Sequence, residues 1–412
     1  MDVVYERCCG LDVHKRTVVA CLLTPGEQGR PQKEVRTFGT MTEDVLALAE
    51  WLAAAGCTHV AMEGTGVYWL PIWNLLEDRF TLLLVNARHV KAVPGRKTDV
   101  KDAEWLADLL RHGLLASSFV PDREQRELRE LTRYRTAVLR ERAAAANRLQ
   151  KTLEAANLKL ASVITDITGK SGRAILRALI AGETEPTRLA ALAQGRLREK
   201  IPQLERALVG QFGAHQRFLV AQQLDHLDFL DERITQMSAE IASRTQPLAA
   251  TVAQLDTIPG VGQRTAEVLV AEVGTDMERF PTADHLASWA GMCPGNHQSA
   301  GQQRSGKTRK GSPWLRAALA EAAQAASRTK GSSLQAQYRR LAARRGKQRA
   351  TVAVGHTILR IVYQLLNDPT TVYDERGTHD ADERNRQAIE RDLVRRLQRL
   401  GNTVVLQPVG VT

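Results

Sequence analysis

The chain has 412 residues, of which 43% are hydrophobic, so it can build two or three domains with ordinary cores and is not a disordered protein. Its formal net charge of +11 indicates a polyanionic partner. Because clustered arginines bind phosphate bidentately, nucleic acid is favoured over a membrane surface. A soluble protein that is merely basic remains the alternative.

The N-terminus and the cysteines bear on where the protein works. MDVVYERCCG does not have the pattern of a secretory signal peptide, and no apolar run approaches the length of a membrane span. The five cysteines show no CxxC spacing, which favours buried thiols over a zinc site or a disulfide framework. We therefore expect a cytoplasmic protein with no membrane partner.

Residues 1–122 alternate between β-rich runs and amphipathic segments, as in an α/β domain. Strands are predicted at 7–13, 17–23, 34–38, 58–62 and 81–86, and helices at 43–55, at 67–78 and from about 100 onward. The predicted order is therefore β-β-β-α-β-α-β-α.

Four carboxylates mark these elements. Asp12 interrupts the apolar run CCGLDVHK, Glu63 follows the strand HVAM, and Asp99 and Asp102 stand three residues apart at the start of the last helix. Residues at i and i+3 share a helix face, although acids in a first turn also serve as caps. Because a buried carboxylate is costly without a cation, and hard oxygen ligands select Mg²⁺ or Mn²⁺, these acids are candidate metal ligands.

The order of these elements and acids resembles the RNase H-like fold of the RuvC type. That resemblance implies that the first and fourth strands are neighbours and that the last helix crosses their ends, so the four acids would converge. His14 and Lys15 follow Asp12 and are interpreted as turn residues, with contact to substrate phosphate as the alternative.

Residues 123–250 are predicted to form a helical connector. Long helices are expected at 123–156 and 214–244, and they could form a coiled coil with each other or with another protomer. The first has a weak apolar seam because Arg135 and Arg142 fall in line with Leu128 and Leu149. Its many arginines form a solvated face or follow a nucleic-acid backbone. Between the long helices, residues 164–208 indicate a small helical insertion.

Residues 251–372 begin with LDTIPGVGQRTAEVLVAEVG, which matches the helix-hairpin-helix pattern. Its turn can present backbone amides to a phosphate, which makes Gly260, Gly262 and Arg264 candidate nucleic-acid contacts; a tight turn between packed helices is the alternative.

The next loop, up to SPWLRAAL, carries four basic residues that we predict to bind phosphate, namely Arg304, Lys307, Arg309 and Lys310. Farther along, the arginines of 339–349 contact a nucleic-acid backbone or form a solvated face. The apolar helix at 351–366 is predicted to lie in the core, with His356 structural, and residues 373–412 form a charged tail.

The motifs GLDVHK, MEGTGVYW, KTDVKDAEWLADLL, IPGVGQRTA and GMCPGNHQSAGQQRSGKTRKGSPWLR occur together and in order. In this combination they resemble the DEDD transposases of the insertion-sequence one-ten family, and GNHQSAG and RSGKTRKG resemble its eleven-eleven subgroup. The matching motifs span about residues 8–113 and 255–319. Residues 164–210 and the tail after 373 carry no motif of the family.

The resemblance implies a RuvC-like domain, a coiled-coil connector and a C-terminal transposase domain. It implies that Asp12, Glu63, Asp99 and Asp102 bind Mg²⁺ and that Ser299, in QSAG, attacks a DNA phosphate to form a covalent serine–DNA intermediate. Gln298 stands where the family usually has an acid or asparagine, so Ser305, in RSG, is a second candidate.

The implied partners are donor and target DNA, a structured guide (bridge) RNA encoded by the element, and further copies of the chain, as a homodimer that assembles into a tetramer. The implied location is the bacterial nucleoid. Two alternatives remain from the residues: a metal-dependent, structure-selective nuclease that hydrolyses DNA with water, and a non-catalytic nucleic-acid-binding protein. A site-specific invertase on the same framework also remains open.

Overall fold

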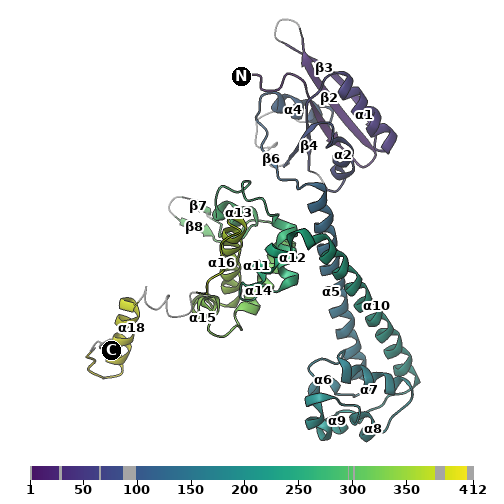
Figure 1. The fold of residues 1–412 in the computed structure, drawn as a ribbon, viewed down its shortest axis with the longest axis vertical. Coiled ribbons are helices and arrows are strands. Elements are labelled where there is room, and N and C mark those ends of the chain that lie inside the picture. Colours follow the sequence, from purple (N-terminus) through teal and green to yellow (C-terminus); the bar gives the residue numbers. More distant parts are fainter. Residues whose placement is uncertain are drawn as a thin grey trace. The chain divides into compact units, whose positions relative to one another are not determined.

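The computed structural model describes residues 2–26, 30–64, 66–86, 99–295, 297–299, 302–375 and 386–405. The chain divides into two compact units, Met1–Pro121 and Asp122–Thr412 (Figure 1). No helix within the described ranges combines the length and the apolar character that a membrane crossing requires.

The N-terminal unit is built on a six-stranded mixed sheet in the order β3-β2-β1-β4-β5-β6. Its strands are β1 (Cys8–Val13), β2 (Thr17–Pro25), β3 (Pro31–Gly39), β4 (His59–Glu63), β5 (Thr81–Val85) and β6 (Ser117–Ser118). β1 pairs antiparallel with β2 and parallel with β4, and β4 pairs parallel with β5. The five predicted strands are confirmed, and the two-residue β6 is an addition.

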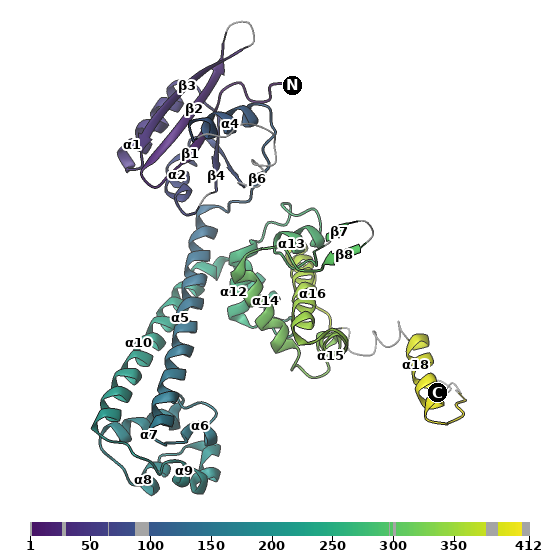
Figure 2. The ribbon, with the colours of Figure 1, turned by 180° about the vertical axis from the view of Figure 1, so that it is seen from behind.

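Helices cover both faces of this sheet (Figure 2). Because side chains alternate along a strand, Cys9 and Leu11 face the core under α1 (Thr42–Ala54) and α2 (Trp69–Leu76). Cys8 lies on the opposite face, in the core under α4 (Asp99–Arg111). The predicted α/β organisation of this region is therefore confirmed.

The second unit is mostly helical and begins with α5 (Arg123–Ala155), which runs side by side with α10 (Ala214–Thr245) (Figures 1 and 2). Of the two pairings that the sequence leaves open, the structure has the one within the chain. At their far end, α6 (Leu160–Val163), α7 (Lys170–Ile180), α8 (Pro186–Ala190), the 3₁₀ helix η2 (Gly195–Lys200) and α9 (Ile201–Ala207) form the insertion. Ile175, Leu176 and Leu204 share one core with Leu149 and Leu224 of the long helices.

The core of the rest of this unit is built around α16 (Lys347–Asn367), whose Val354, Ile358 and Val362 are fully buried, as predicted for this helix. The other helices of this part are the short η3 (Gln246–Leu248), α11 (Ala249–Asp256), α12 (Gln263–Val273), α13 (Ala283–Trp289), α14 (Pro313–Ala326) and α15 (Ser333–Arg345). A hairpin of β7 (His297–Ser299) and β8 (Gln302–Ser305) lies between α13 and α14 in the chain. The tail contains one more helix, α18 (Arg386–Arg399), which the charged sequence did not reveal.

Candidate active site

Asp12 and Glu63 lie side by side at the ends of two parallel strands. The β1–β4 register runs from Cys8 opposite His59 to Leu11 opposite Met62, so Asp12 and Glu63 come next on their strands. Side-chain alternation places Asp12 on the same face as Cys8, and Glu63 on the same face as Ala61, which is the face that α4 covers. Two of the four predicted acids therefore share one edge and one face of the sheet.

α4 brings a third acid to this edge, because it crosses β1 in close backbone contact at Gly10. A Cβ atom on Gly10 would lie 2.9 Å from Leu106 Cβ and closer still to the Ala103 carbonyl oxygen and the Ala107 amide nitrogen. Only glycine allows this approach. Asp102 precedes Ala103 on the same part of the helix. Asp99 is the first residue of α4, one turn earlier, and its side chain lies outside the described atoms.

The electrostatics confirm that the three described carboxylates interact. Burial raises the pKa of Asp12 above its usual value, His14 opposes this rise, and the negative charges of Asp102 and Glu63 raise the pKa further. The Asp12 side chain is only 14% exposed, and its Oδ2 lies 3.1 Å from Nε2 of His14. His14 lies in the turn after β1, and its ring nitrogen is within hydrogen-bonding distance of the Asp12 carboxylate.

Within the described ranges, no three His, Cys, Asp or Glu side chains are grouped closely enough to hold a metal ion. The chemistry of the donor set nevertheless fits a divalent cation, because Asp12, Glu63 and Asp102 are hard oxygen donors whose like charges destabilise one another. Asp99 would complete the set from the first turn of α4.

The predicted serine lies in the second unit, at the tip of the β7–β8 hairpin. Ser299 is the last residue of β7 and pairs with Gln302, whereas Ser305 ends β8 opposite His297. The side chains of Ser299, Arg304 and Ser305 lie outside the described atoms. By backbone position, Ser299 is the serine next to the turn.

A groove of about 1090 Å³ lies beside the segment that follows this hairpin. Lys307, Arg345 and Arg349 line it and are exposed, and His356 contributes from α16. Burial lowers the pKa of His356, and its Nε2 lies 4.0 Å from Sγ of Cys293. Two arginines from the predicted run at 339–349 thus face the same groove as a predicted lysine, while Arg309 and Lys310 are exposed farther along.

The turn between α11 and α12 has two kinds of glycine. Gly260 has a φ of +87°, and a Cβ there would lie 2.9 Å from Ala326 Cβ and closer still to the Ala322 carbonyl oxygen, so Gly260 allows the turn to pack against α14. Gly262 and Arg264 are exposed at the start of α12. The structure therefore gives Gly260 a packing role and leaves the other two accessible.

Several arginines of α5 bind groups of their own unit. Arg135 Nη1 donates to Glu267 Oε2 at 2.6 Å, with both side chains almost fully buried, and Arg133 binds both carboxylate oxygens of Glu272, at 2.6 and 2.9 Å. Arg142 pairs with Asp231 of α10. For Arg135 the prediction of a solvated or nucleic-acid-facing surface is therefore wrong, because its side chain is buried in an ion pair. Arg142 is partly exposed, but it is paired within its own unit.

Two family models match the chain. The model of the DEDD transposases of IS110, the insertion-sequence one-ten family, is described as a transposase and matches residues 9–158. The model described as "Transposase IS116/IS110/IS902 family" matches residues 252–339. The first match contains the sheet with its acids, and the second contains the β7–β8 hairpin.

Curated relatives agree with these matches. The chain is 28% identical to a "probable family 20 transposase" of Pseudomonas aeruginosa over 320 residues, which cover 76% of this chain and 84% of that protein. It is 28% identical over 220 residues to a protein of insertion element IS110 from Streptomyces coelicolor, covering 49% of this chain and 53% of that protein. Over 78 residues, 18% of this chain and 24% of the relative, it is 37% identical to a pilin gene-inverting protein of Moraxella bovis. The chain belongs to the IS110 family of DEDD transposases, enzymes that cleave and join DNA.

Proposed function

We propose that this transposase cuts and rejoins donor and target DNA through a covalent bond between Ser299 and a DNA phosphate. The observation that supports the proposal is that Asp12 and Glu63 share one edge and one face of the sheet with Asp102 of α4 nearby, and that burial, followed by the charges of Asp102 and Glu63, raises the pKa of Asp12. Like charges near a buried carboxylate destabilise the folded state unless a cation compensates them, which favours a metal-binding role for these acids.

The fold that we propose for the N-terminal unit is RNase H-like, of the RuvC type. Three antiparallel strands (β3, β2, β1) followed by the parallel β4 and β5, with α4 across β1, support it. In the second unit, the pairing of α5 with α10 supports a coiled-coil connector, and α11, the IPGVG turn and α12 support a helix-hairpin-helix.

DEDD transposases typically depend on a metal ion. We propose Mg²⁺, with Mn²⁺ as a substitute, held by Asp12, Glu63, Asp99 and Asp102. When bound, the ion would lower the pKa of the attacking hydroxyl and neutralise charge on the phosphate. The protein's part is to hold these acids, and His14 would pair with Asp12 in the absence of the ion, since its Nε2 lies 3.1 Å from the Asp12 carboxylate.

In the proposed reaction, the Ser299 oxygen forms a bond to phosphorus while the bond to one DNA oxygen breaks, and that oxygen leaves with a proton. One phosphoester replaces another, so the second DNA end can reverse the step without ATP. The basic groove of Lys307, Arg345 and Arg349 would bind the DNA backbone next to the hairpin.

Choice of sequence would rest with a guide RNA from the element, and the working assembly would be a homodimer pairing into a tetramer in which one protomer's acids meet another's serine. These parts come from the family resemblance. The net charge of +11 is in keeping with two nucleic-acid partners.

The test is a denaturing gel of the purified protein incubated with the element-derived RNA, labelled donor and target DNA, and Mg²⁺. Wild type should give a protein–DNA adduct, and Ser299→Ala and Asp102→Ala should both lose it. Ser305→Ala is the matched control from the same hairpin and should keep it. Cleavage without an adduct, unaffected by Ser299→Ala, would instead establish a nuclease that uses water.

Site-specific inversion is a second candidate function, favoured by the 37% identity to the pilin gene-inverting protein over 78 residues. A plasmid with two recombination sites in inverted orientation separates the two functions. Inversion of the segment between the sites indicates an invertase, whereas insertion into an unlinked target indicates transposition.

A further inference from the structure

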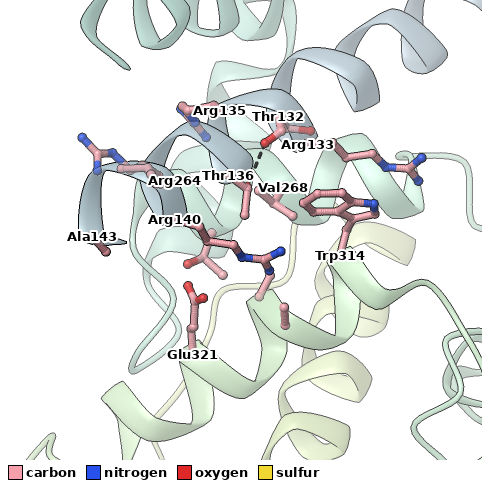
Figure 3. A pocket seen from close by; sticks show the side chains of 14 residues that line it. Thr132, Arg133, Arg135, Thr136, Arg140, Ala143, Arg264, Val268, Trp314 and Glu321 are labelled. Atoms are coloured by element: carbon pink, nitrogen blue, oxygen red, sulfur yellow. Dashed lines mark hydrogen bonds between the residues drawn. The ribbon is translucent and has the colours of Figure 1, made fainter. Parts of the chain in front are cut away.

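A cavity of about 410 Å³ lies between α5, α12 and α14, within the second unit (Figure 3). Its volume falls in the range of about 300–1,000 Å³ that is usual for small-molecule sites. Arg140 comes from α5, Arg264 from α12, and Trp314 and Glu321 from α14. Arg264 and Trp314 belong to the motifs IPGVGQRTA and GSPWLR, whereas Arg140 and Glu321 lie outside every motif of the family.

Trp314 is the first unusual feature of the cavity. Its neighbour Leu315 is fully buried in the helical core, but the half-buried Trp314 is not among the residues of that core. The guanidinium carbon of Arg140 lies 5.1 Å from the centre of its ring. An exposed, flexible side chain thus covers one face of the indole, and a flat aromatic group could occupy the same place.

Charge is the second feature. Arg133 and Arg135 also line the cavity, but their charges are balanced by Glu272 and Glu267. Neither Arg140 nor Arg264 makes an ion pair with any residue that the structure describes, and both are exposed. In Figure 3, Arg140 lies between Trp314 and Glu321, and Arg264 lies on the opposite side from Trp314. The cavity therefore combines an aromatic face, two cations and one carboxylate.

We infer that this cavity binds one unpaired nucleotide of the nucleic acid on which the enzyme works, an inference that rests on the proposed function. The base stacks on Trp314 in place of the Arg140 guanidinium, which then turns to the phosphate together with Arg264. Glu321 accepts a hydrogen bond from an amino group on the base edge, which favours cytosine, adenine or guanine over uracil and thymine. The nucleotide belongs to single-stranded RNA or to an unpaired stretch of DNA.

The first test measures binding of fluorescent single-stranded RNA and DNA of about 12 nucleotides, and of a duplex of the same sequence, by anisotropy. Trp314→Ala should weaken single-strand binding about 5- to 150-fold, the range for stacking one base on an aromatic ring, while Trp314→Phe keeps most of the affinity. Phe229→Ala is the matched control, because Arg233 covers Phe229 at 4.9 Å on α10, away from the cavity. Comparing the loss of affinity for RNA with the loss for DNA shows which of the two the cavity binds.

The second test uses the wild-type protein, so that it does not depend on the folding of a variant. Oligonucleotides with one 5-iodopyrimidine are irradiated, and the crosslinked peptide is identified by mass spectrometry. A crosslink at Trp314 supports the inference. Crosslinks that all map elsewhere, or an affinity that Trp314→Ala leaves unchanged, overturn it.

Glu321→Gln tests the base preference. It should reduce the advantage of oligocytidine over oligouridine, and an unchanged ratio would remove Glu321 from the site. The two proposals can fail separately. An adduct at Ser299 without a crosslink at Trp314 would support the serine mechanism and refute the nucleotide site. A crosslink at Trp314 without any adduct would support the nucleotide site and refute the serine mechanism.

Discussion

The buried ion pair of Arg135 and Glu267 should be compatible with a stable second unit only while both partners are present. Their side chains are 2% and 3% exposed, and Nη1 lies 2.6 Å from Oε2. Removing one partner leaves a buried charge without compensation, which typically costs about 3–5 kcal/mol. We therefore expect Glu267→Ala and Arg135→Met each to destabilise the second unit by about that amount.

The double variant Arg135→Met with Glu267→Leu should recover most of the loss, because well-packed apolar residues replace buried ion pairs at little or no cost. At about 2–4 °C per kcal/mol, each single variant should lower Tm by about 6–20 °C, and the double variant much less. Urea unfolding followed by circular dichroism measures the same differences, provided that the slope m is unchanged.

The matched control is the exposed pair of Arg244 and Glu127, which joins α10 to α5 at 2.7 Å. Glu127→Ala should change Tm little, because water solvates both charges. If Glu267→Ala were as mild as Glu127→Ala, or if the double variant were as unstable as the sum of its singles, the account of α5 as a helix with interior charges would be refuted.

Three further expectations follow from the sites. Gly10→Ala should cost at least about 2 kcal/mol and abolish DNA cleavage, because the new methyl group forces α4 away from β1; urea unfolding and the gel assay check this. Asp12→Asn should abolish cleavage but raise the Tm of the metal-free protein at neutral pH, since the folded state disfavours the ionised carboxylate. Because folding raises the pKa of Asp12, the cost of ionising this carboxyl in the folded protein grows as the pH rises above its ordinary pKa of 3.8. The gain in Tm from Asp12→Asn should therefore vanish at about pH 3, where Asp12 is protonated in both states. Arg349→Ala should weaken DNA binding and reduce the slope of log K against the logarithm of the salt concentration by about 1, because one phosphate contact is lost. Anisotropy titrations at several salt concentrations measure this slope.

Each of these three predictions has a control variant and an outcome that would contradict it. Gly64→Ala adds a methyl group that meets only ordinary contacts, the nearest at 3.4 Å, so equal damage from both glycine variants would contradict the crossing argument. Mg²⁺ should raise the Tm of wild type more than that of Asp12→Asn, and equal rises would remove Asp12 from the metal site. Arg360 lies on α16 outside the groove and near Asp284, so Arg360→Ala should leave the salt slope unchanged.

The sequence predicted the N-terminal unit well, because its strands and helices carry strong local periodicity. Five strands and the helices around them lie where alternation and amphipathic spacing place them, within a few residues. β6 was missed because two residues, Ser117 and Ser118, carry no pattern. α18 was missed because its apolar residues, Leu393 and Leu397 among them, are diluted by charge.

The candidate site was predictable only as separate residues. The sequence singled out Asp12, Glu63 and Asp102 because an acid at the end of an apolar strand or at a helix start is conspicuous. The sequence singled out Arg264 as a candidate nucleic-acid contact, but it gave no sign of the cavity at Trp314, since Arg140, Arg264 and Glu321 come from three different helices.

The sequence by itself determined most of the secondary structure, the basic character and the family, because these depend on neighbouring residues and on motifs read in order. Only the tertiary structure decided which charges are free to act. Arg135 and Glu267 are 132 residues apart in the chain. Gly10 contacts α4, although the two lie near opposite ends of the N-terminal unit in the sequence. Whether a charge binds DNA, a metal ion or its own protein depends on what packing brings within a few ångströms of it, and that distance is set by the fold as a whole.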